Sequence, residues 1–380
     1  MSKFLDSLTG LTSYFFPGNG PAVATADRDG EGVRASGSDV VGLESRPTST
    51  GPVASRRSVR PPVRLRDRLL LRRPVQRTTM DNDLPPVAEG PAGWNAPAES
   101  ANVRPWGDDV MASPRIHPLA VVDPRADVAP DVEIGPFCIV GPHVSIGPGS
   151  RLIARVTVLG HTTLGSDNTL HPGCVVGGDP QDKKFRGEET RLIVGDGNDI
   201  RENVTIHTGT AAGSGVTVIG DRNLIMVGAH IGHDAVVGDD CVLGNNIMLA
   251  GHVEIGNRVS MMGGAACHHF VSIGDFAFVG GYAHIHIDVP PYVKVDGEDR
   301  IRAVNVIGLR RSGEADDADI AALEIAVRRL FVSKKQPVAT IIKEMLADEN
   351  LNARVREVVD VVRRRALGRH GRYLEGSRKA

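Results

Sequence analysis

Histidines are concentrated in one part of this 380-residue sequence, between Ile219 and His286. An unperturbed imidazole titrates near pH 6.5, so at neutral pH it can take a proton from a hydroxyl group as a general base. A backbone N–H beside a glycine is sterically open and can stabilise the oxyanion that develops during acyl transfer. Histidines next to glycines are therefore candidates for a general base and an oxyanion donor. Those considered for this chemistry are His230, His233, His252, His268 and His269.

The same segment has a small or aliphatic apolar residue at every sixth position. A period of six matches neither the repeat of about 3.6 residues of a helix nor the alternation of a strand. It matches a parallel β-helix, in which each hexad forms a short strand and a turn and three hexads close one coil. The inward side chains then stack from coil to coil and form a continuous core. The residues in frame are Ile116, Val122, Val128, Ile134, Val140, Ile146, Leu152, Val158, Leu164, Leu170 and Val176, then Val194, Ile200 and Ile206, then Ile219, Ile225, Ile231, Val237, Leu243, Leu249, Ile255, Met261, Cys267, Ile273, Val279 and Ile285.

Three hexads per coil place residues that are 18 positions apart directly above one another. Neighbouring parallel strands are about 4.8 Å apart, so His233, His252 and His268 are predicted to line one edge within about 10 Å. Gly251 falls in the same column as His233. Asp234 follows His233, but adjacent residues of a strand point to opposite faces, so the sequence does not by itself establish a direct pairing between these two. The histidines are staggered along the coil axis and lack the spacing of a ligand set such as HxxxH, so no metal site is predicted.

Two insertions interrupt the repeat, at 177–193 and at 207–218. Insertions in a solenoid form loops on its surface, often at the binding site. The first insertion is strongly polar, which favours a role in ligand binding. The repeat as a whole is predicted to span 113–293.

The two ends of the chain differ from the repeat. Residues 1–112 are rich in Pro, Gly, Ser and Arg and are predicted to be disordered, because they cannot bury enough apolar surface. Their arginine-rich part is either a solvated tail or a contact for an anionic surface. Pro290 and Pro291 end the strand pairing. Three amphipathic stripes then predict an α-helical domain over 294–372, followed by a tail at 373–380. The exposed cluster Arg328, Arg329, Lys334 and Lys335 is either an ordinary solvated helix face or a docking site for an acidic carrier protein.

Composition excludes several classes of protein. The net charge of −2 argues against binding nucleic acid through bulk charge. The four cysteines show no CxxC pair, which favours buried thiols in a reducing compartment. No apolar run approaches the roughly 20 residues that span a bilayer, and the start lacks a signal sequence. A cytoplasmic protein without an integral membrane segment is therefore expected.

Several motifs resemble the UDP-N-acetylglucosamine O-acyltransferases, a family of hexapeptide-repeat acyltransferases. The resemblance implies that the β-helix is left-handed and that the protein is a homotrimer with active sites between neighbouring β-helices. It also implies transfer of a 3-hydroxyacyl chain from acyl carrier protein to the 3-hydroxyl of UDP-N-acetylglucosamine, the first step of lipid A synthesis, without a cofactor. The motifs are Gln181-Asp182, Gly187-Glu188, Asn203-Val204-Thr205-Ile206-His207, Ala229-His230-Ile231-Gly232-His233-Asp234, Gly251-His252 and Val289-Pro290-Pro291-Tyr292-Val293.

The resemblance also implies a role for each matching residue. His233 would be the general base, and the Gly251 amide would stabilise the oxyanion. Gly281 takes the place of the residue that limits acyl length; a glycine would leave a long groove open, which predicts a chain of more than ten carbons. The residues expected to contact the sugar, the phosphates, the nucleotide or the acyl chain are Gln181, Asp182, Lys184, His207, His230, His252, His268, Asn305 and Arg311.

The sequence also departs from the family pattern. His269 replaces a glutamine, and Gly297-Glu298-Asp299 lacks the expected histidine. Ile307 and Ser312 replace an acidic and a basic residue. An N-acyltransferase that acts on a UDP-amino sugar is therefore the main alternative, although residues 1–112 do not resemble its uridine-binding domain. A metal protein similar to the γ-carbonic anhydrases and a non-catalytic trimeric scaffold are weaker alternatives.

Overall fold

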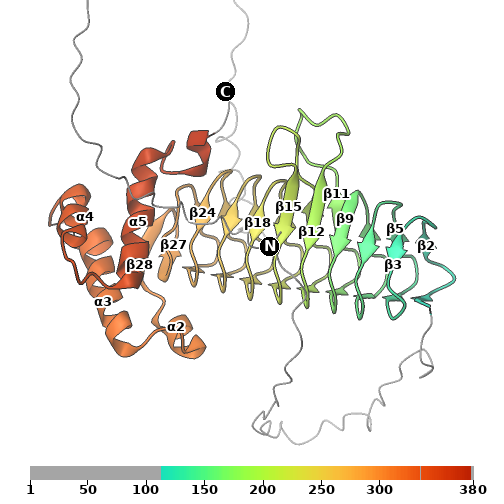
Figure 1. The fold of residues 1–380 in the computed structure, drawn as a ribbon, viewed down its shortest axis with the longest axis horizontal. Helices are drawn as coiled ribbons and strands as arrows, with labels where there is room; N and C mark the ends of the chain where they lie inside the picture. The colour runs from blue at the N-terminus through green and yellow to red at the C-terminus, as the bar shows by residue number, and fades with distance from the viewer. Residues whose placement is uncertain (1–112, 334, 378–380) are drawn as a thin grey trace, which may run out of the picture. The chain divides into compact units, whose positions relative to one another are not determined.

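The computed structural model describes residues 113–333 and 335–377. The predicted disorder of 1–112, residue Lys334 of the basic cluster and the last residues 378–380 of the predicted tail lie outside this part of the chain. From Arg115 onward the chain winds into short strands that form three sheets, one on each side of a three-sided β-helix. Figure 1 shows the coils stacked side by side, with the helices beyond the last coil.

The strands are mostly two residues long, because each hexad divides between a strand and a turn. Sheet A contains β1 (Arg115–Ile116), β4 (Glu133–Ile134), β7 (Arg151–Leu152), β10 (Thr169–Leu170), β13 (Asp199–Ile200), β16 (Leu224–Ile225), β19 (Val242–Leu243), β22 (Ser260–Met261), β25 (Phe278–Val279), β27 (Val293–Asp296) and β28 (Arg300–Val304). Sheet B contains β2 (Val121–Val122), β5 (Ile139–Val140), β8 (Thr157–Val158), β11 (Val175–Gly178), β14 (Thr205–His207), β17 (His230–Ile231), β20 (Met248–Leu249), β23 (Ala266–Cys267) and β26 (His284–Ile285). Sheet C contains β3 (Asp127–Val128), β6 (Ser145–Ile146), β9 (His161–Leu164), β12 (Arg191–Val194), β15 (Val216–Ile219), β18 (Val236–Val237), β21 (Glu254–Ile255) and β24 (Ser272–Ile273).

Strand pairing confirms the predicted coil of 18 residues. Parallel partners such as Arg115 and Glu133 are 18 positions apart. The separation grows to 30 positions between β10 and β13 and to 25 between β13 and β16. The extra residues form two loops, 179–190 between β11 and β12 and 208–215 between β14 and β15, so both predicted insertions are loops at the turn from sheet B to sheet C.

The in-frame aliphatic residues form the core. Ile134, Leu152 and Leu170 are almost completely buried, as is the rest of the series in the inner coils. Ile116 is 40% exposed because the first described coil has a neighbour on one side only. Burial in the stack, rather than strand length, therefore stabilises each two-residue strand.

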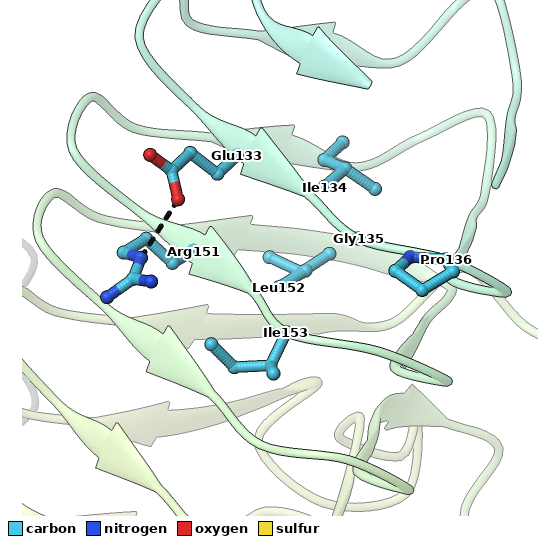
Figure 2. A pocket seen from close by; sticks show the side chains of 7 residues that line it. All are labelled: Glu133, Ile134, Gly135, Pro136, Arg151, Leu152 and Ile153. Atoms are coloured by element: carbon cyan, nitrogen blue, oxygen red, sulfur yellow. Dashed lines mark hydrogen bonds and ion pairs between the residues drawn. The ribbon is translucent and has the colours of Figure 1, made fainter. Parts of the chain in front are cut away.

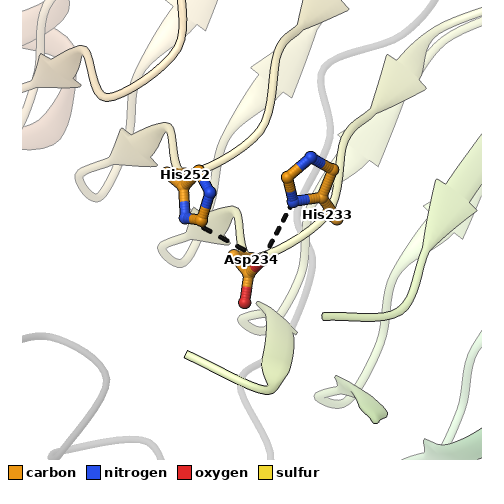
Figure 3. Close-up of side chains that lie close together, drawn as sticks. All are labelled: His233, Asp234 and His252. Atoms are coloured by element: carbon orange, nitrogen blue, oxygen red, sulfur yellow. Dashed lines mark hydrogen bonds and ion pairs between the residues drawn. The ribbon is translucent and has the colours of Figure 1, made fainter. Parts of the chain in front are cut away.

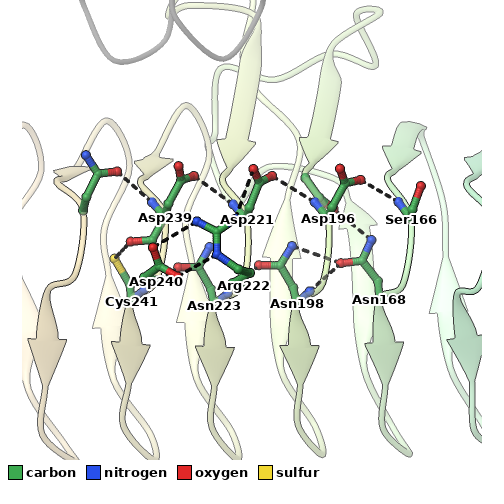
Figure 4. A network of polar contacts seen from close by, with 12 residues as sticks. Ser166, Asn168, Asp196, Asn198, Asp221, Arg222, Asn223, Asp239, Asp240 and Cys241 are labelled. Atoms are coloured by element: carbon green, nitrogen blue, oxygen red, sulfur yellow. Dashed lines mark hydrogen bonds and ion pairs between the residues drawn. The ribbon is translucent and has the colours of Figure 1, made fainter. Parts of the chain in front are cut away.

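Two polar ladders run along the turns from sheet C to sheet A (Figure 4). On the inner ladder, each asparagine side chain accepts a hydrogen bond from the backbone N–H of the next coil, at 2.9 Å from Asn198 N to Asn168 Oδ1 and 2.9 Å from Asn223 N to Asn198 Oδ1. On the outer ladder the direction is reversed, and Asp196 N donates to Asp221 Oδ1 at 3.0 Å. These side chains satisfy turn N–H groups that the sheets cannot reach, so the ladders join successive coils.

The C-terminal part begins with strands rather than helices. The α-helical domain was predicted to begin at residue 294, but β27 and β28 form an antiparallel hairpin that continues sheet A, and the first helix begins only at Val306. The core of the β-helix thus extends past the prolines, because Val293 and Val295 remain buried. The elements that follow are α2 (Val306–Ser312), α3 (Asp317–Val327), the π-helix η1 (Arg328–Val332), α4 (Val338–Leu346), α5 (Ala353–Leu367) and the 3-10 helix η2 (Leu374–Ser377). None of the described helices has the length and apolar character needed to cross a membrane.

Candidate active site

The turns from sheet B to sheet C stack into one edge of the β-helix, which we call the histidine edge. It consists of the loops 179–190 and 208–215 followed by the turns 232–235, 250–253 and 268–271. His233, His252 and His268 lie on three successive turns of this edge, as the 18-residue spacing predicts. The rings of His233 and His252 have centroids 5.0 Å apart in an edge-to-face arrangement.

His233 pairs directly with the next residue. His233 Nδ1 lies 2.9 Å from Asp234 Oδ2, and Figure 3 shows both side chains turned toward each other. The sequence left this pairing open, because the alternation of side chains in a strand would turn the two residues to opposite faces. Both residues belong to a turn, and Asp234 has a φ of 59°, so the alternation of a strand does not apply.

The pairing sets the proton on the imidazole. Burial alone would raise the pKa of Asp234, but hydrogen bonds from His233 and Thr210 outweigh it and hold that pKa well below its ordinary value. An ionised carboxylate only accepts hydrogen bonds, so the neutral His233 ring carries its proton on Nδ1. Nε2 is then unprotonated, and within the described residues it makes no hydrogen bond. His233 therefore has the tautomer that a general base requires.

Gly251 lies against the Nε2 side of the His233 ring. A Cβ atom at Gly251 would be 2.6 Å from His233 Nε2 and 2.5 Å from Cε1, so only glycine fits there. The Gly251 N–H donates no hydrogen bond within the described part of the chain. The unprotonated His233 Nε2 and the Gly251 N–H, which donates no hydrogen bond, thus lie beside each other on the histidine edge.

His252 packs between two rings. Its ring stacks on Phe270 with centroids 4.3 Å apart, and its Nδ1 is 3.8 Å from Asp234 Oδ2. Both His252 and Phe270 have positive φ angles, 64° and 66°, which place them at equivalent points of successive turns. Phe270 therefore sets the orientation of His252 beside the His233–Asp234 pair.

His207 and His230 lie just before His233 on the same edge. Their rings are 4.8 Å apart, and His230 Nδ1 is 2.8 Å from Thr205 Oγ1. Burial lowers the pKa of His207 to about 4, with further contributions from His230 and His233. Burial also lowers the pKa of His230, with a contribution from His233. Both rings are therefore neutral at pH 7 and suit hydrogen bonds to a sugar better than binding to a phosphate.

The other predicted ligand contacts are distributed along the same edge. Gln181, Asp182 and Lys184 lie on the loop 179–190, two coils before His233, where Asp182 Oδ1 accepts the Lys184 N–H at 2.9 Å. On the far side, His268 Nδ1 is 3.1 Å from the His269 carbonyl oxygen and its ring is 6.2 Å from that of His286.

Three predicted site residues lie away from the histidine edge. Gly281 is exposed in the turn from β25 to β26, which joins sheet A to sheet B. Asn305 is 6% exposed and caps α2, accepting the Gly308 N–H at 3.3 Å and donating to Phe276 O at 2.9 Å. Arg311 is exposed on α2. Within one chain these residues are not brought together with His233.

The His233, Asp234 and His252 cluster was considered as a metal site. One ligand atom from each lies within 4.8 Å of the others, which is tighter than the sequence spacing predicted. The donor set does not fit, however. Asp234 Oδ1 already accepts hydrogen bonds from the N–H groups of Ser214 and Gly215, and Oδ2 from His233 and the Thr210 hydroxyl. A carboxylate surrounded by donors has no lone pair directed at a cation.

A small hollow on sheet A is a weaker candidate for the active site than the histidine edge. It lies in the second and third coils (Figure 2), and its charged residues Glu133 and Arg151 pair with each other at 3.0 Å. It contains neither a histidine nor a nucleophile. The histidine edge is therefore the candidate active site.

Asp234 was not predicted from the sequence as the partner of His233, and neither Thr210 nor Ser214 was among the predicted site residues. A signal for Asp234 was present, because Asp234, His252 and Phe270 are 18 positions apart and occupy one turn position. No periodic signal existed for Thr210 and Ser214, since both lie inside an insertion.

Comparison with known proteins points to one family of acyltransferases. A family model described as "Udp N-acetylglucosamine O-acyltransferase; Domain 2" matches residues 288–370, and a bacterial transferase hexapeptide model matches 216–246. An acyl-[acyl-carrier-protein]–UDP-N-acetylglucosamine O-acyltransferase from Anaeromyxobacter sp. is 49% identical over 203 residues, 53% of this chain and 79% of that protein. One of the same name from Synechocystis sp. is 44% identical over 59% of this chain and 81% of its own length.

Solved structures extend the similarity to the fold. The UDP-N-acetylglucosamine O-acyltransferase of Moraxella catarrhalis aligns with a TM-score of 0.61 and 40% identity over 64% of this chain and 95% of that chain. The acyltransferase of Bacteroides fragilis aligns with a TM-score of 0.62 and 35% identity over 65% and 96%. The left-handed hexapeptide-repeat β-helix followed by a helical part, implied by the resemblance, is therefore the fold of this chain. With most of the length of these relatives covered at 40–49% identity, the chain belongs to the UDP-N-acetylglucosamine O-acyltransferase family.

Proposed function

We propose that this protein transfers a 3-hydroxyacyl chain from acyl carrier protein to the 3-hydroxyl of UDP-N-acetylglucosamine, the first step of lipid A synthesis. The relatives that match over most of their length are named acyl-[acyl-carrier-protein]–UDP-N-acetylglucosamine O-acyltransferases, which supports acyl carrier protein and UDP-N-acetylglucosamine as the substrates. The observation that carries the proposal is the His233 ring, held by Asp234 and in contact with Gly251.

The geometry suits the following reaction. His233 Nε2 takes the proton of the sugar hydroxyl as its oxygen attacks the carbonyl carbon of the acyl thioester. The carbonyl oxygen becomes an oxyanion, which the Gly251 N–H stabilises. When the tetrahedral intermediate collapses, the carbon–sulfur bond breaks and the His233 imidazolium returns the proton to the leaving thiolate. Asp234 keeps its negative charge throughout and stabilises the imidazolium.

We also propose that the functional unit is a homotrimer with sites between neighbouring chains. Gly281 and His233 lie on different edges of one β-helix, so a groove that reaches both needs a second copy. Met248 on the outer face of sheet B and Val227 in the adjoining turn are 50% and 40% exposed, which a neighbouring chain would cover. Sedimentation equilibrium should give three times the chain mass, and a monomer with full activity would contradict the proposal.

The proposal also includes binding of the carrier protein to the helical part and a cytoplasmic location of the enzyme. Arg328 and Lys335 are exposed on the helical part and would attract an acidic carrier protein, while Arg329 pairs with Glu344. The four cysteines are free, buried thiols, which fits a reducing compartment such as the cytoplasm.

Acyl transfer measured with purified protein tests the function. The protein should acylate UDP-N-acetylglucosamine from 3-hydroxyacyl carrier protein and form an ester, which mild alkali cleaves. The analogue with an amine at the sugar 3-position is assayed in parallel. Acylation of the amine alone would replace the proposal by N-acyl transfer, and activity lost in a chelator and restored by a metal would replace the metal-free mechanism.

A further inference from the structure

The loop 208–215 closes over the carboxylate of Asp234. Thr210 donates to this carboxylate through its N–H, at 3.1 Å from Oδ2, and through its hydroxyl, at 2.6 Å from Oδ2. Ser214 donates through its N–H at 2.7 Å and its hydroxyl at 2.9 Å, both to Oδ1. The Gly215 N–H adds a contact of 3.1 Å to Oδ1. We call Thr210 and Ser214 the clamp residues.

The loop fits closely around this one group. A Cβ atom at Gly213 would be 2.4 Å from Asp234 Oδ2, so the backbone itself lies against the carboxylate. The loop folds on itself, with the N–H groups of Gly213 and Gly215 both donating to the Thr210 carbonyl at 3.0 Å. The Asp234 side chain is fully buried beneath it. The loop therefore shields the carboxylate from water.

The loop is also an exception to the repeat. The coil that contains it is longer than the coils after it, and those later coils make their B-to-C turn in four residues without an insertion. The turn at 250–253 holds His252 in the position equivalent to Asp234 and needs no loop. An insertion whose side chains converge on the partner of the catalytic histidine is more than a connection between strands.

We infer that Thr210 and Ser214 are positioning residues for the acyl transfer reaction, because they hold Asp234 in the orientation that fixes the His233 ring. The inference rests on the proposed function, in which His233 is the base. Neither clamp residue needs to touch the substrate. Each acts through Asp234, so loss of a clamp hydroxyl should lower turnover without weakening substrate binding.

The test compares Thr210→Val, Ser214→Ala and the double variant with the wild-type enzyme. Hydrogen bonds to charged groups are strong, so the double variant should lose roughly 10–100-fold in kcat while KM for both substrates stays within about twofold. Thr208→Val is the matched control. Thr208 is a buried residue of the same loop whose hydroxyl bonds Thr190 rather than Asp234, so it should retain the wild-type kcat.

Two further readouts separate positioning from a general loss of structure. Thr210→Ser keeps the hydroxyl and should restore kcat to near the wild-type value. The hydrogen bonds from the clamp residues also reduce the negative charge that the Asp234 carboxylate presents to His233. Their removal should therefore move the acid limb of the pH profile of kcat/KM to higher pH. The other titratable groups near His233 are His207, His230 and His252, and all three remain in each variant.

A measurement without substrate completes the test. In the wild type, the 15N shifts of the His233 ring should report one neutral tautomer with the proton on Nδ1, and the double variant should show a mixture. Unchanged kcat, unchanged pH profile and a single tautomer in the double variant would overturn the inference. An equal loss of kcat in Thr208→Val would do so too. If the wild-type protein transfers no acyl group, the proposed function fails, and the tautomer measurement still decides whether the clamp positions His233.

Discussion

At the scale of single residues, the site depends on one turn. Asp234 is the residue after His233, yet the left-handed backbone at Asp234 brings the two side chains together at 2.9 Å. The carboxylate orients the ring, and Gly251 leaves room for it. Three neighbouring groups thus account for a base and an oxyanion donor without any cofactor in the proposed mechanism.

His233→Ala should reduce kcat by roughly 10²–10⁴-fold, because general base catalysis contributes about that much. The measurement is the steady-state rate of acyl transfer at saturating substrates. His143→Ala is a suitable control, since His143 lies between β5 and β6, several coils before His233, and its ring stacks on that of His161 with centroids 4.3 Å apart. Both variants should keep the β-rich circular dichroism of the wild type. Near-wild-type turnover in His233→Ala would remove His233 as the base.

His207 should make the folded state sensitive to acid. Burial lowers its folded pKa from 6.5 to about 4, so the unfolded chain binds the proton more readily. The stability is therefore fully present above pH 6.5 and is lost as the pH falls from 6.5 toward 4. Between pH 7 and pH 5 the loss amounts to about 2 kcal/mol from this group. Urea unfolding of His207→Gln at both pH values should show a smaller decrease than the wild type, and equal decreases would contradict the assignment.

At the scale of elements, side-chain ladders and stacked aliphatic residues hold together strands that are too short to be stable alone. The inner ladder is buried, with Asn198 1% exposed, whereas Asp196 of the outer ladder is exposed to solvent. An unsatisfied buried N–H costs more than an exposed one, which water can reach. The two ladders should therefore contribute differently to stability.

Asn198→Ala should destabilise the fold by about 1–3 kcal/mol, because the Asn223 N–H loses its acceptor in a buried turn. Asp196→Ala removes an equivalent acceptor from the exposed ladder and should cost less than about 1 kcal/mol. Chemical denaturation of both variants at one fixed protein concentration compares them. Equal costs would show that burial does not distinguish the two ladders.

At the scale of the whole molecule, some predicted site residues lie far from the histidine edge of their own chain, and the proposed trimer would bring them near the histidine edge of a neighbour. Gly281 is one of them. A side chain at this position meets open space, since an added Cβ would have only Gly263 O at 3.5 Å and Met262 Cβ at 3.8 Å within its surroundings. The fold therefore tolerates a larger residue at position 281, and its side chain would project outward from the β-helix.

Gly281→Met should shift the acyl preference toward shorter chains. Each methylene group that is no longer buried loses about 0.8 kcal/mol, so kcat/KM should fall roughly tenfold for every two methylenes excluded. A series of 3-hydroxyacyl carrier proteins of increasing length measures the effect. KM for the sugar nucleotide serves as the control and should not change. An unaltered preference would show that Gly281 does not line the acyl groove.

The sequence by itself determined the coil, the core and the histidine edge. All three follow from a period of six and from stacking at 18 positions, which are local regularities that hold wherever the repeat is unbroken. The positions of His233, Gly251 and His252 followed from the 18-residue spacing. The two loops were predicted where the period of six is interrupted.

Only the tertiary structure decided how the site is assembled. The His233–Asp234 pair depends on a left-handed turn residue, and the contacts of Thr210 and Ser214 with Asp234 join positions 24 and 20 residues apart. The hairpin of β27 and β28 likewise continues sheet A beyond residue 294, where the helical domain was predicted to begin. The physical reason is common to these features. A repeat specifies backbone positions that recur, whereas an insertion or an end has no periodic neighbour, and its conformation is set by the buried polar groups that it must satisfy.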